Sequence, residues 1–377
     1  MSDWRYSSLG EILPFKYGKG LPERKRSGTG EFNVVSSAGI AGTHNTALTS
    51  EPCVVIGRKG TIGSLHYCPE PVWPIDTTFY VTGSEQIEIR YAYYFLRTLP
   101  LAAMNNDSAV PGLNRSQAEA IKVCIPDIAE QRRIVGLLGT LDDKIESNQT
   151  VVTRAEQLID EIAEQKAIDL PTVALSEVCS LSKSTWKPDT SSDQTVHLFS
   201  LPAFDEGAVP EQAAVSSIKS NKTLMDRPGV LVSRLNPRFS RMWWVEIDAT
   251  PVSVCSPEFA YLTAGDMHGL ACTWLAVRSP EFRGEIVDRV TGTSGSHQRV
   301  RPADLMTIGV PDYRSLVEHT QMAVLTLLHL VSARRQQSVV LAELRDALLP
   351  ELMSGRMRVD EAGRLVSEAL DEEVADV

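Results

Sequence analysis

Two segments of the chain, residues 127–170 and 312–358, carry apolar residues at alternating spacings of three and four. The second segment repeats these positions 189 residues later, and the polar Asn148 of the first corresponds to Gln337 of the second. Such a spacing is typical of a coiled-coil seam rather than of a globular helix face. We therefore predict two long helices that pair through Leu138, Leu141, Ile145, Asn148, Val152, Ile159, Leu327, Leu330, Gln337, Leu341, Leu344 and Leu348.

Helix-boundary signals support the first of these segments. Asp127 follows Pro126 and can cap a helix, with Glu130 three residues later as in a capping box. About 40 helical residues span ~60 Å, which is enough to hold two globular units apart. Because a second unit at the far end of the first helix requires the second helix to run back, we expect antiparallel pairing. Asn148 and Gln337 are compatible with a buried layer that fixes the register and with the solvent edge of a bundle.

Outside the helices, the chain contains a weak internal repeat. Four pairs of segments match in the same order: 9–12 with 175–178, 54–58 with 230–234, 78–81 with 258–261, and 109–126 with 294–311, the last without a gap. This order indicates two copies of one unit. Short β-branched runs between clusters of Gly, Pro, Ser and Asn indicate that each copy is a mixed α/β unit.

These patterns predict an α+β fold in which two similar mixed α/β domains are separated by two long antiparallel coiled-coil helices. The boundaries that we expect are 1–126 for the first domain, 127–170 for its helix, 171–311 for the second domain and 312–358 for the second helix. The residues after Pro350 are expected to form a short returning segment. From Asp360 the chain holds seven acidic residues and one arginine, so we expect residues 359–377 to be a disordered acidic tail.

Length and charge are compatible with this organisation. The 377 residues suffice for two or three domains, and the net charge is −11. Residues 1–126 carry +1 and 171–311 carry −2, whereas 127–170 and 312–377 carry −5 each. The acidity therefore lies in the helices and the tail, and it does not exclude a nucleic-acid partner for the two domains.

Nothing in the sequence indicates a membrane or secreted protein. The longest mostly apolar run, Met322–Val331, is about half of what spans a bilayer, and the N-terminus lacks the pattern of a signal peptide. The six cysteines are scattered without a C-x-x-C pair, which argues against a zinc ribbon or a disulfide framework. We expect a protein of the reducing cytoplasm with no membrane contact and no metal.

Basic side chains gather in loops of each predicted domain. Residues 16–26 hold five basic residues among glycine and proline, and residues 219–241 hold six. Such loops are often only solvated surface, but they also suit phosphate contacts and the reading of guanine by arginine. The candidate DNA-binding residues are Lys16, Lys19, Arg24, Lys25, Arg26, Arg58, Lys59, Asn114, Arg115, Lys219, Lys222, Arg234, Arg238, Arg241, Arg299 and Arg301.

Motifs for catalysis are weak. Residues 236–239 (NPRF) resemble the N-P-P-[FY] signature of DNA adenine methyltransferases, but the second proline is missing and no glycine-rich loop for S-adenosylmethionine precedes them. The glycines of 57–63 are spaced neither as a dinucleotide fingerprint nor as a Walker loop. We assign no catalytic residue, and we expect residues 236–239 to form a turn after a strand.

Four segments together resemble the specificity subunit of type I restriction-modification systems. They are GRKGTIG at 57–63, VPGLNRS at 110–116, IPDIAEQRRIV at 125–135 running into LDDKIE at 141–146, and LLPELMSGRMRV at 348–359. In the second copy of the repeat the match is poorer, since RLNPRF stands where the first copy has RKGTIG. Divergence there is expected if the two domains read different bases.

The resemblance implies a non-catalytic subunit of a DNA methyltransferase and endonuclease complex. Its two target-recognition domains each read one half of a split, asymmetric site in double-stranded DNA, and its two helices set the gap. It recruits two modification subunits, which bind S-adenosylmethionine, and then restriction subunits; the chain itself needs no cofactor. Whether a restriction partner exists stays open, as do two alternatives: a self-contained adenine methyltransferase that uses Asn236–Phe239, and a coiled-coil scaffold without nucleic acid.

Overall fold

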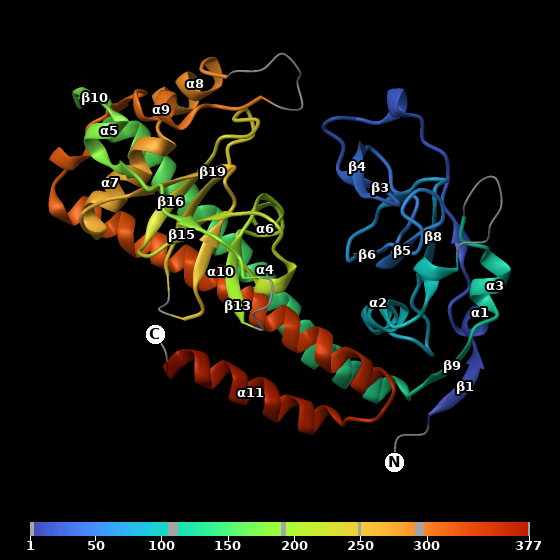
Figure 1. The fold of residues 1–377 in the computed structure, drawn as a ribbon. Helices are drawn as coiled ribbons and strands as arrows, with labels where there is room; N and C mark the ends of the chain where they lie inside the picture. The colour runs from blue at the N-terminus through green and yellow to red at the C-terminus, as the bar shows by residue number, and fades with distance from the viewer. Residues whose placement is uncertain (1–3, 105–111, 190–193, 248–249, 291–297, 376–377) are drawn as a thin grey trace. The chain divides into compact units, whose positions relative to one another are not determined.

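The computed structural model describes residues 4–104, 112–189, 194–247, 250–290 and 298–375 (Figure 1). The chain divides into two compact units: unit 1 is Met1–Asp143 with Leu341–Val377, and unit 2 is Lys144–Val340. Each unit contains one β-rich domain and a part of each long helix. The predicted α+β class is confirmed.

The domain of unit 1 is built on an antiparallel four-stranded sheet whose central strand is wholly buried. Cys53, Val54, Val55 and Ile56 are fully buried because both faces of this strand are covered. The sheet has the order β2 (Lys16–Tyr17), β8 (Thr78–Thr82), β5 (Cys53–Gly57), β6 (Leu65–Cys68). Beside it are a three-stranded sheet of β4 (Gly39–His44), β3 (Phe32–Ser36) and β7 (Trp73–Pro74), and the pair β1 (Arg5–Ser8) and β9 (Lys122–Ile125).

Short helices close this domain. Helix α2 packs on β5 and β6, and its first turn is capped by Glu88, whose carboxylate accepts a hydrogen bond from Tyr91 N at 2.6 Å. The helices are α1 (Leu9–Ile12), α2 (Ile89–Arg97) and α3 (Arg115–Glu119), with the 3₁₀ turns η1 (Glu23–Lys25) and η2 (Leu101–Ala103).

The domain of unit 2 repeats this plan. Its four-stranded sheet has the order β11 (Ser180–Leu181), β19 (Phe259–Thr263), β16 (Gly229–Ser233), β17 (Met242–Val245), which is the order of β2-β8-β5-β6 in unit 1. The pair β10 (Thr172–Ala174) and β20 (Gly309–Pro311) corresponds to β1 and β9. The helices are α5 (Leu175–Val178), α6 (Leu201–Asp205), α7 (Met267–Arg278), α8 (Pro280–Asp288) and α9 (Pro302–Met306), with η3 (Val215–Ser217) and η4 (Tyr313–Ser315).

The two copies differ in their second sheet. Unit 2 has five strands there, in the order β12 (Thr185–Trp186), β15 (Lys222–Met225), β18 (Ser253–Cys255), β13 (Thr195–Phe199), β14 (Glu211–Ala214), against three in unit 1. Both second sheets contain one parallel pair, β3 with β7 and β13 with β18. The predicted internal duplication therefore holds for the first sheet, the terminal strand pair and the helix that covers the sheet.

The gapless match of residues 109–126 with 294–311 is wrong by two residues. Ile121 O accepts a hydrogen bond from the first residue of α1, and in the second copy the carbonyl that does so for α5 is that of Ile308. The sequence match aligned Pro126 with Pro311, but Pro126 follows strand β9 whereas Pro311 is the last residue of β20. Proline can end an edge strand or follow it, so it is a poor marker of register.

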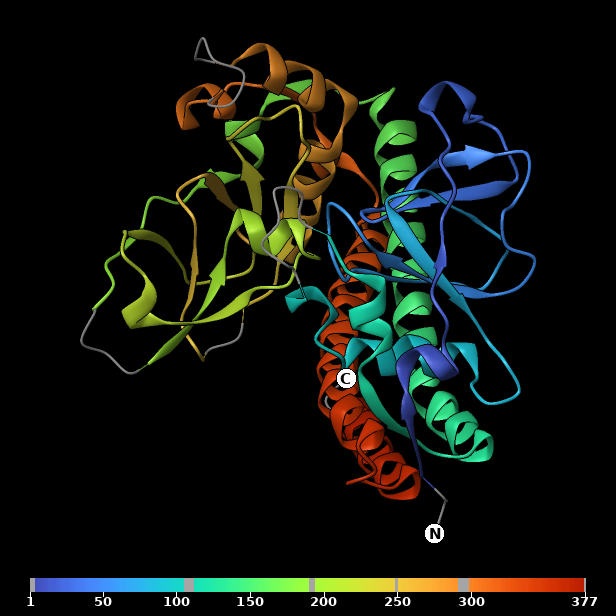
Figure 2. The same cartoon turned by 90° about the vertical axis from the view of Figure 1, so that its right-hand side faces the viewer.

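The two long helices are α4 (Ile128–Ala167) and α10 (Glu318–Met353). The predicted cap of α4 is present, since Glu130 N donates to Asp127 Oδ1 at 2.9 Å. Within unit 2 the helices pack side by side and antiparallel (Figures 1 and 2): Asn148 Nδ2 donates to Gln337 Oε1 at 2.9 Å, and Val152 and Ala155 pack on Val331 earlier in α10. Asn148 is buried, so this polar pair lies in an inner layer and not at the solvent edge.

Two predictions for the C-terminal region are wrong. Helix α10 contains Pro350 in its last turn and continues to Met353, and it ends before Gly355, whose φ is +72°. Residues expected to be a disordered tail form helix α11 (Val359–Ala375). Ala362 and Val366 are four residues apart and buried, so this acidic helix has an apolar stripe that composition alone does not show.

Cysteines and apolar helices add little to the architecture. All six cysteines have free thiols. Over the described ranges, every helix is too short or too polar to cross a bilayer.

Candidate nucleic-acid interface

In unit 1, an exposed tyrosine ring lies between two of the predicted arginines. The guanidinium carbon of Arg58 is 5.1 Å from the ring centroid of Tyr17 and that of Arg115 is 5.7 Å from it. The ring of Phe79, 5.6 Å from Arg58, supports the same guanidinium from the sheet. Since Tyr17 is 52% exposed, this cluster presents a ring face and the Arg58 cation to solvent, whereas Arg115 is paired with Glu119 at 2.9 Å.

Backbone geometry brings these residues together from three parts of the sequence. Tyr17 ends β2, Arg58 follows β5, and Arg115 begins α3. Leu113 N donates to Arg58 O at 2.9 Å, which ties the loop before α3 to the β5–β6 loop. The β5–β6 loop needs glycine because Gly60 and Gly63 have φ of +79° and +73°.

The other basic residues of unit 1 have different surroundings. Arg24, Lys25 and Lys59 are exposed, and Lys19 lies 5.9 Å from the Trp73 ring. Lys16 donates to Thr82 Oγ1 at 3.0 Å. Arg26 turns inward: Nη1 donates to Ala41 O at 3.0 Å and Nε donates to Leu21 O at 3.3 Å, so this arginine holds its loop in place. Asn114 caps α3 by accepting from Gln117 N at 3.2 Å.

In unit 2, the corresponding β16–β17 loop carries both an exposed ring and arginines. The Phe239 ring is 51% exposed and lies 4.9 Å from the guanidinium carbon of Arg238 and 5.5 Å from that of Arg241. A small cavity of about 160 Å³ lies beside it, lined among others by Pro237 and by Arg283 of α8. In both domains the connection after the buried central strand thus carries an arginine next to an exposed ring; the ring belongs to β2 in unit 1 and to the loop itself in unit 2.

Three predicted arginines of unit 2 face partners that occupy them. Arg241 forms a bidentate pair with Asp205 at 2.6 and 2.9 Å, and Arg299 forms one with Glu258 at 2.6 and 2.9 Å. These guanidinium groups hold the pKa of each carboxyl below its ordinary value. Arg234 donates to the carbonyls of Pro257 and Val300, and burial lowers its pKa. These side chains brace loops.

The remaining candidates of unit 2 face solvent to different degrees. Lys219, Arg238 and Arg301 are exposed, whereas Lys222 is half-buried and donates to Ser220 Oγ at 2.7 Å. Residues 236–239 form a turn in which Phe239 N donates to Asn236 O at 2.9 Å, as expected from the sequence, and Asn236 has φ of +48°.

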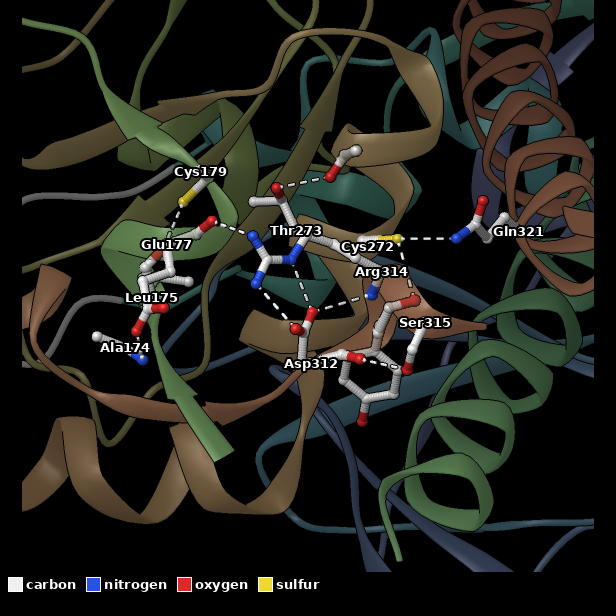
Figure 3. Close-up of polar contacts among 12 residues, drawn as sticks. Ala174, Leu175, Glu177, Cys179, Cys272, Thr273, Asp312, Arg314, Ser315 and Gln321 are labelled. Atoms are coloured by element: carbon white, nitrogen blue, oxygen red, sulfur yellow. Dashed lines mark hydrogen bonds and ion pairs between the residues drawn. The ribbon is translucent and has the colours of Figure 1, made fainter. Parts of the chain in front are cut away.

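Figure 3 shows the polar contacts that anchor the base of this domain to the start of α10. Arg314 donates to Asp312 at 2.7 and 2.8 Å and to Glu177 O at 2.6 Å, and this guanidinium lowers the pKa of the Asp312 carboxyl. Cys272 Sγ donates to Tyr313 O at 3.3 Å, and burial raises the pKa of the Cys272 thiol to about 11. A protonated thiol is a poor nucleophile, so this network is structural.

The predicted helix-pair residues lie at buried or half-buried positions. Leu138, Leu141, Asn148, Val152, Ile159, Leu341 and Leu348 are buried, and Ile145, Leu327, Leu330, Gln337 and Leu344 are half-buried. The prediction missed Val324, Leu325 and Leu328, which are buried in the core of the unit 2 domain. The start of α10 contacts both α4 and this core, so its apolar residues occupy two faces and the heptad pattern selects only one. The apolar run Met322–Val331 was the feature of the sequence that could have indicated this second buried face.

Sequence reasoning also assigned no role to two glutamines, Gln131 and Gln321. Both are buried near the starts of the long helices and hydrogen-bonded to other elements of their units. Gln131 lies inside the segment 125–135 that carried the family resemblance, but a polar residue near a predicted helix start gives no indication that its side chain is buried.

Comparisons with known proteins agree with this architecture. Residues 1–157 match the family model of the type I restriction modification DNA specificity domain. The S subunit of a type I restriction-modification system from M. genitalium has a similar structure, with a TM-score of 0.62 and 14% sequence identity over 93% of this chain and 96% of that chain. A search of curated proteins gave no match.

Two further solved structures align over most of the chain. The HsdS subunit from Thermoanaerobacter tengcongensis is 16% identical over 94% of this chain and 97% of that one, with a TM-score of 0.32. A structure describing complex assembly and conformational transition of the type I R-M system is 16% identical over 93% of this chain and 97% of that chain, with a TM-score of 0.35. The domain that the family model matches is a specificity module and not a catalytic one, in agreement with the absence of a catalytic assignment from the sequence. Residues 1–157 therefore match the type I restriction modification DNA specificity domain, and the fold of the chain is similar to that of the S subunit from M. genitalium.

Proposed function

We propose that this specificity subunit reads a two-part, asymmetric site in double-stranded DNA, with one half-site for each domain. The observation that carries the proposal is the repeated plan of the two domains, each with an arginine on the same hairpin connection beside an exposed aromatic ring. Sequence-specific reading needs side chains that are oriented before they meet the bases. The rings of Tyr17 and Phe239 orient Arg58 and Arg238 in this way.

The differences between the loops fit two different half-sites. The unit 1 loop is glycine-rich, whereas the unit 2 loop contains Pro237 and Phe239. We assign the first recognition domain to residues 1–126 and the second to residues 171–311. Helices α4 and α10, in 127–170 and 312–358, are then the spacer that sets the gap between half-sites.

We further propose that catalysis belongs to partners. Two modification subunits with bound S-adenosylmethionine would methylate the site, and restriction subunits would join where the system has them. The net charge of −11 supports this division, because DNA binding by electrostatics requires basic surface, and the chain as a whole is acidic. The modification subunits would close around the DNA and supply much of the phosphate neutralisation.

DNA binding by the chain alone and by its complex tests the proposal. Both are titrated against genomic fragments at about 100 mM salt in an electrophoretic mobility assay with excess nonspecific competitor. We expect weak binding by the chain alone and specific binding by the complex with the modification subunit. Tight specific binding by the chain alone, or no specific binding by the complex, would contradict it.

A further inference from the structure

A buried glutamine occupies the same place in both long helices. Gln131 is the fourth residue of α4 and Gln321 is the fourth residue of α10. Gln131 is fully buried and Gln321 is 9% exposed. Since a buried side-chain amide is costly unless its donor and acceptor are both satisfied, its partners show which elements it holds together.

In unit 1, Gln131 joins three segments. Its Oε1 accepts from Glu88 N at 2.9 Å, and its Nε2 donates to Gln86 O and to Pro126 O, both at 3.0 Å. Glu88 is the N-cap of α2, and Pro126 follows strand β9. The amide thus fixes the first turn of α4 to the start of α2 and to the strand pair that closes the domain.

In unit 2, Gln321 contacts the corresponding helix, but its partners are side-chain atoms and not backbone atoms. Its Oε1 lies 3.2 Å from His268 Nδ1, and its Nε2 donates to Cys272 Sγ at 3.4 Å (Figure 3). Both partners are on α7, which packs on β16, β17 and β19 as α2 packs on the corresponding sheet. The same residue type at the same helix position therefore holds the equivalent helix in both domains, although the partner atoms differ.

Other contacts between each domain and its helix act on the same angle, and Tyr94 of α2 also donates to Asp142 of α4. The apolar contacts of α4 and α10 with the unit 2 core, through residues such as Ile159 and Leu328, are non-directional. The ion pair Arg90–Asp143 is partly exposed, whereas Arg278 Nε and Nη2 donate to both carboxylate oxygens of Asp160 at 2.7 and 2.6 Å and add a second directional contact in unit 2. A buried amide with a donor and an acceptor on one short side chain is directional.

We infer that Gln131 and Gln321 are positioning residues that set the angle of each recognition domain on its helix, and thereby the half-site spacing that the complex accepts. This inference rests on the proposed function. A rotation of ~10° moves a loop ~20 Å from the helix by about 3.5 Å, given the size of a domain of this length. That displacement is close to the ~3.4 Å rise of one base pair.

Methylation mapping tests the inference. Cells carry the modification subunit with the wild-type chain, Gln131→Leu, Gln321→Leu or the double variant, and methylated sites are sequenced across the genome. Leucine keeps most of the side-chain volume and removes both hydrogen-bonding functions. Gln149→Leu, at an exposed position of α4, is the matched control. Thermal unfolding of each purified complex is measured in parallel, and methionine replaces leucine where a leucine variant does not fold.

We expect the wild type and the control to methylate one two-part motif with a single spacer length. The Gln131 and Gln321 variants should keep both half-sites, accept spacers one base pair shorter or longer, and methylate the original spacing several-fold less. Variants that methylate only the original spacing, however weakly, would overturn the inference and leave the proposed function standing. A wild-type motif without two parts would remove the proposed function and this inference with it.

Discussion

Arginine side chains of the two recognition domains differ in whether a carboxylate or a carbonyl group holds the guanidinium group or an aromatic ring lies beside it. Arg241 and Arg299 face carboxylates and Arg26 faces backbone carbonyls, so these three brace loops. Arg58 and Arg238 face aromatic rings, which orient a guanidinium without neutralising it. The second arrangement leaves the positive charge available to a ligand, although Arg58 Nη1 also donates to Asp76 O at 3.4 Å.

The exposed Arg24 and Lys25 of η1 should act through phosphate neutralisation. We predict that Arg24→Ala with Lys25→Ala weakens DNA binding by the complex and reduces the slope of log affinity against log salt by about two, because each lost phosphate contact contributes ~0.9. Titrations at several salt concentrations measure this slope. An unchanged slope would remove this loop from the interface. Arg26→Ala is the comparison, and it should act through loss of the loop anchor.

The pair of Asp312 and Arg314 should make stability depend on pH. Arg314 lowers the pKa of Asp312 in the folded state. A carboxyl with a lowered folded-state pKa stabilises the fold above its unfolded pKa of about 4, and this contribution is lost as the pH falls. We predict that Asp312→Asn lowers the free energy of unfolding by about 1–2 kcal/mol at pH 7. The difference from wild type should shrink below pH 4. Denaturant titrations at pH 7 and 3 measure it, and a difference that stays constant would contradict the assignment.

Contacts of individual residues explain which roles could not be predicted from the sequence. The partners of Arg241 and Arg299 are 36 and 41 residues away in the chain, so local composition could not distinguish bracing arginines from free ones. The burial of Gln131 depends on carbonyls of Gln86 and Pro126 that only the tertiary fold brings to it.

The long helices could be predicted from the sequence, since the spacing of apolar residues that specifies them is a local pattern. The heptad pattern placed α4 and α10 and even the contact of Asn148 with Gln337, because a coiled-coil seam repeats a short spacing many times. It failed for α11, whose acidic composition concealed the stripe that contains Ala362 and Val366. It also failed for the second face of α10, where the partner is the core of a domain and not another helix.

The polar layer of the helix pair should restrict the oligomeric state of the chain at a cost in stability. Asn148 is buried, and Gln337 retains a second partner, Arg334 Nη1 at 2.9 Å, if Asn148 is removed. We predict that Asn148→Leu raises the free energy of unfolding by about 1 kcal/mol, because an apolar side chain then fills the layer. It should also allow additional oligomeric states. Denaturant unfolding and analytical ultracentrifugation measure the two effects, with the exposed Gln149→Leu as control. A loss of stability with an unchanged oligomeric state would contradict this role.

The chain as a whole joins two copies of one domain through two helices. The family model matches residues 1–157, which include the first domain and most of α4. The second domain diverges in sequence but keeps the strand order of the first sheet. A duplicated scaffold with different loops is what a reader of two unlike half-sites requires, because the scaffold fixes position and the loops carry specificity.

Methylation motifs of domain-selective variants test the central claim most directly. Cells carrying the modification subunit with the wild-type chain, Arg58→Ala or Arg238→Ala are compared by sequencing their methylated sites. We predict a two-part, asymmetric wild-type motif, with bases relaxed in one half for Arg58→Ala and only in the other half for Arg238→Ala. A continuous motif, or both substitutions relaxing the same half, would contradict the assignment of one half-site to each domain.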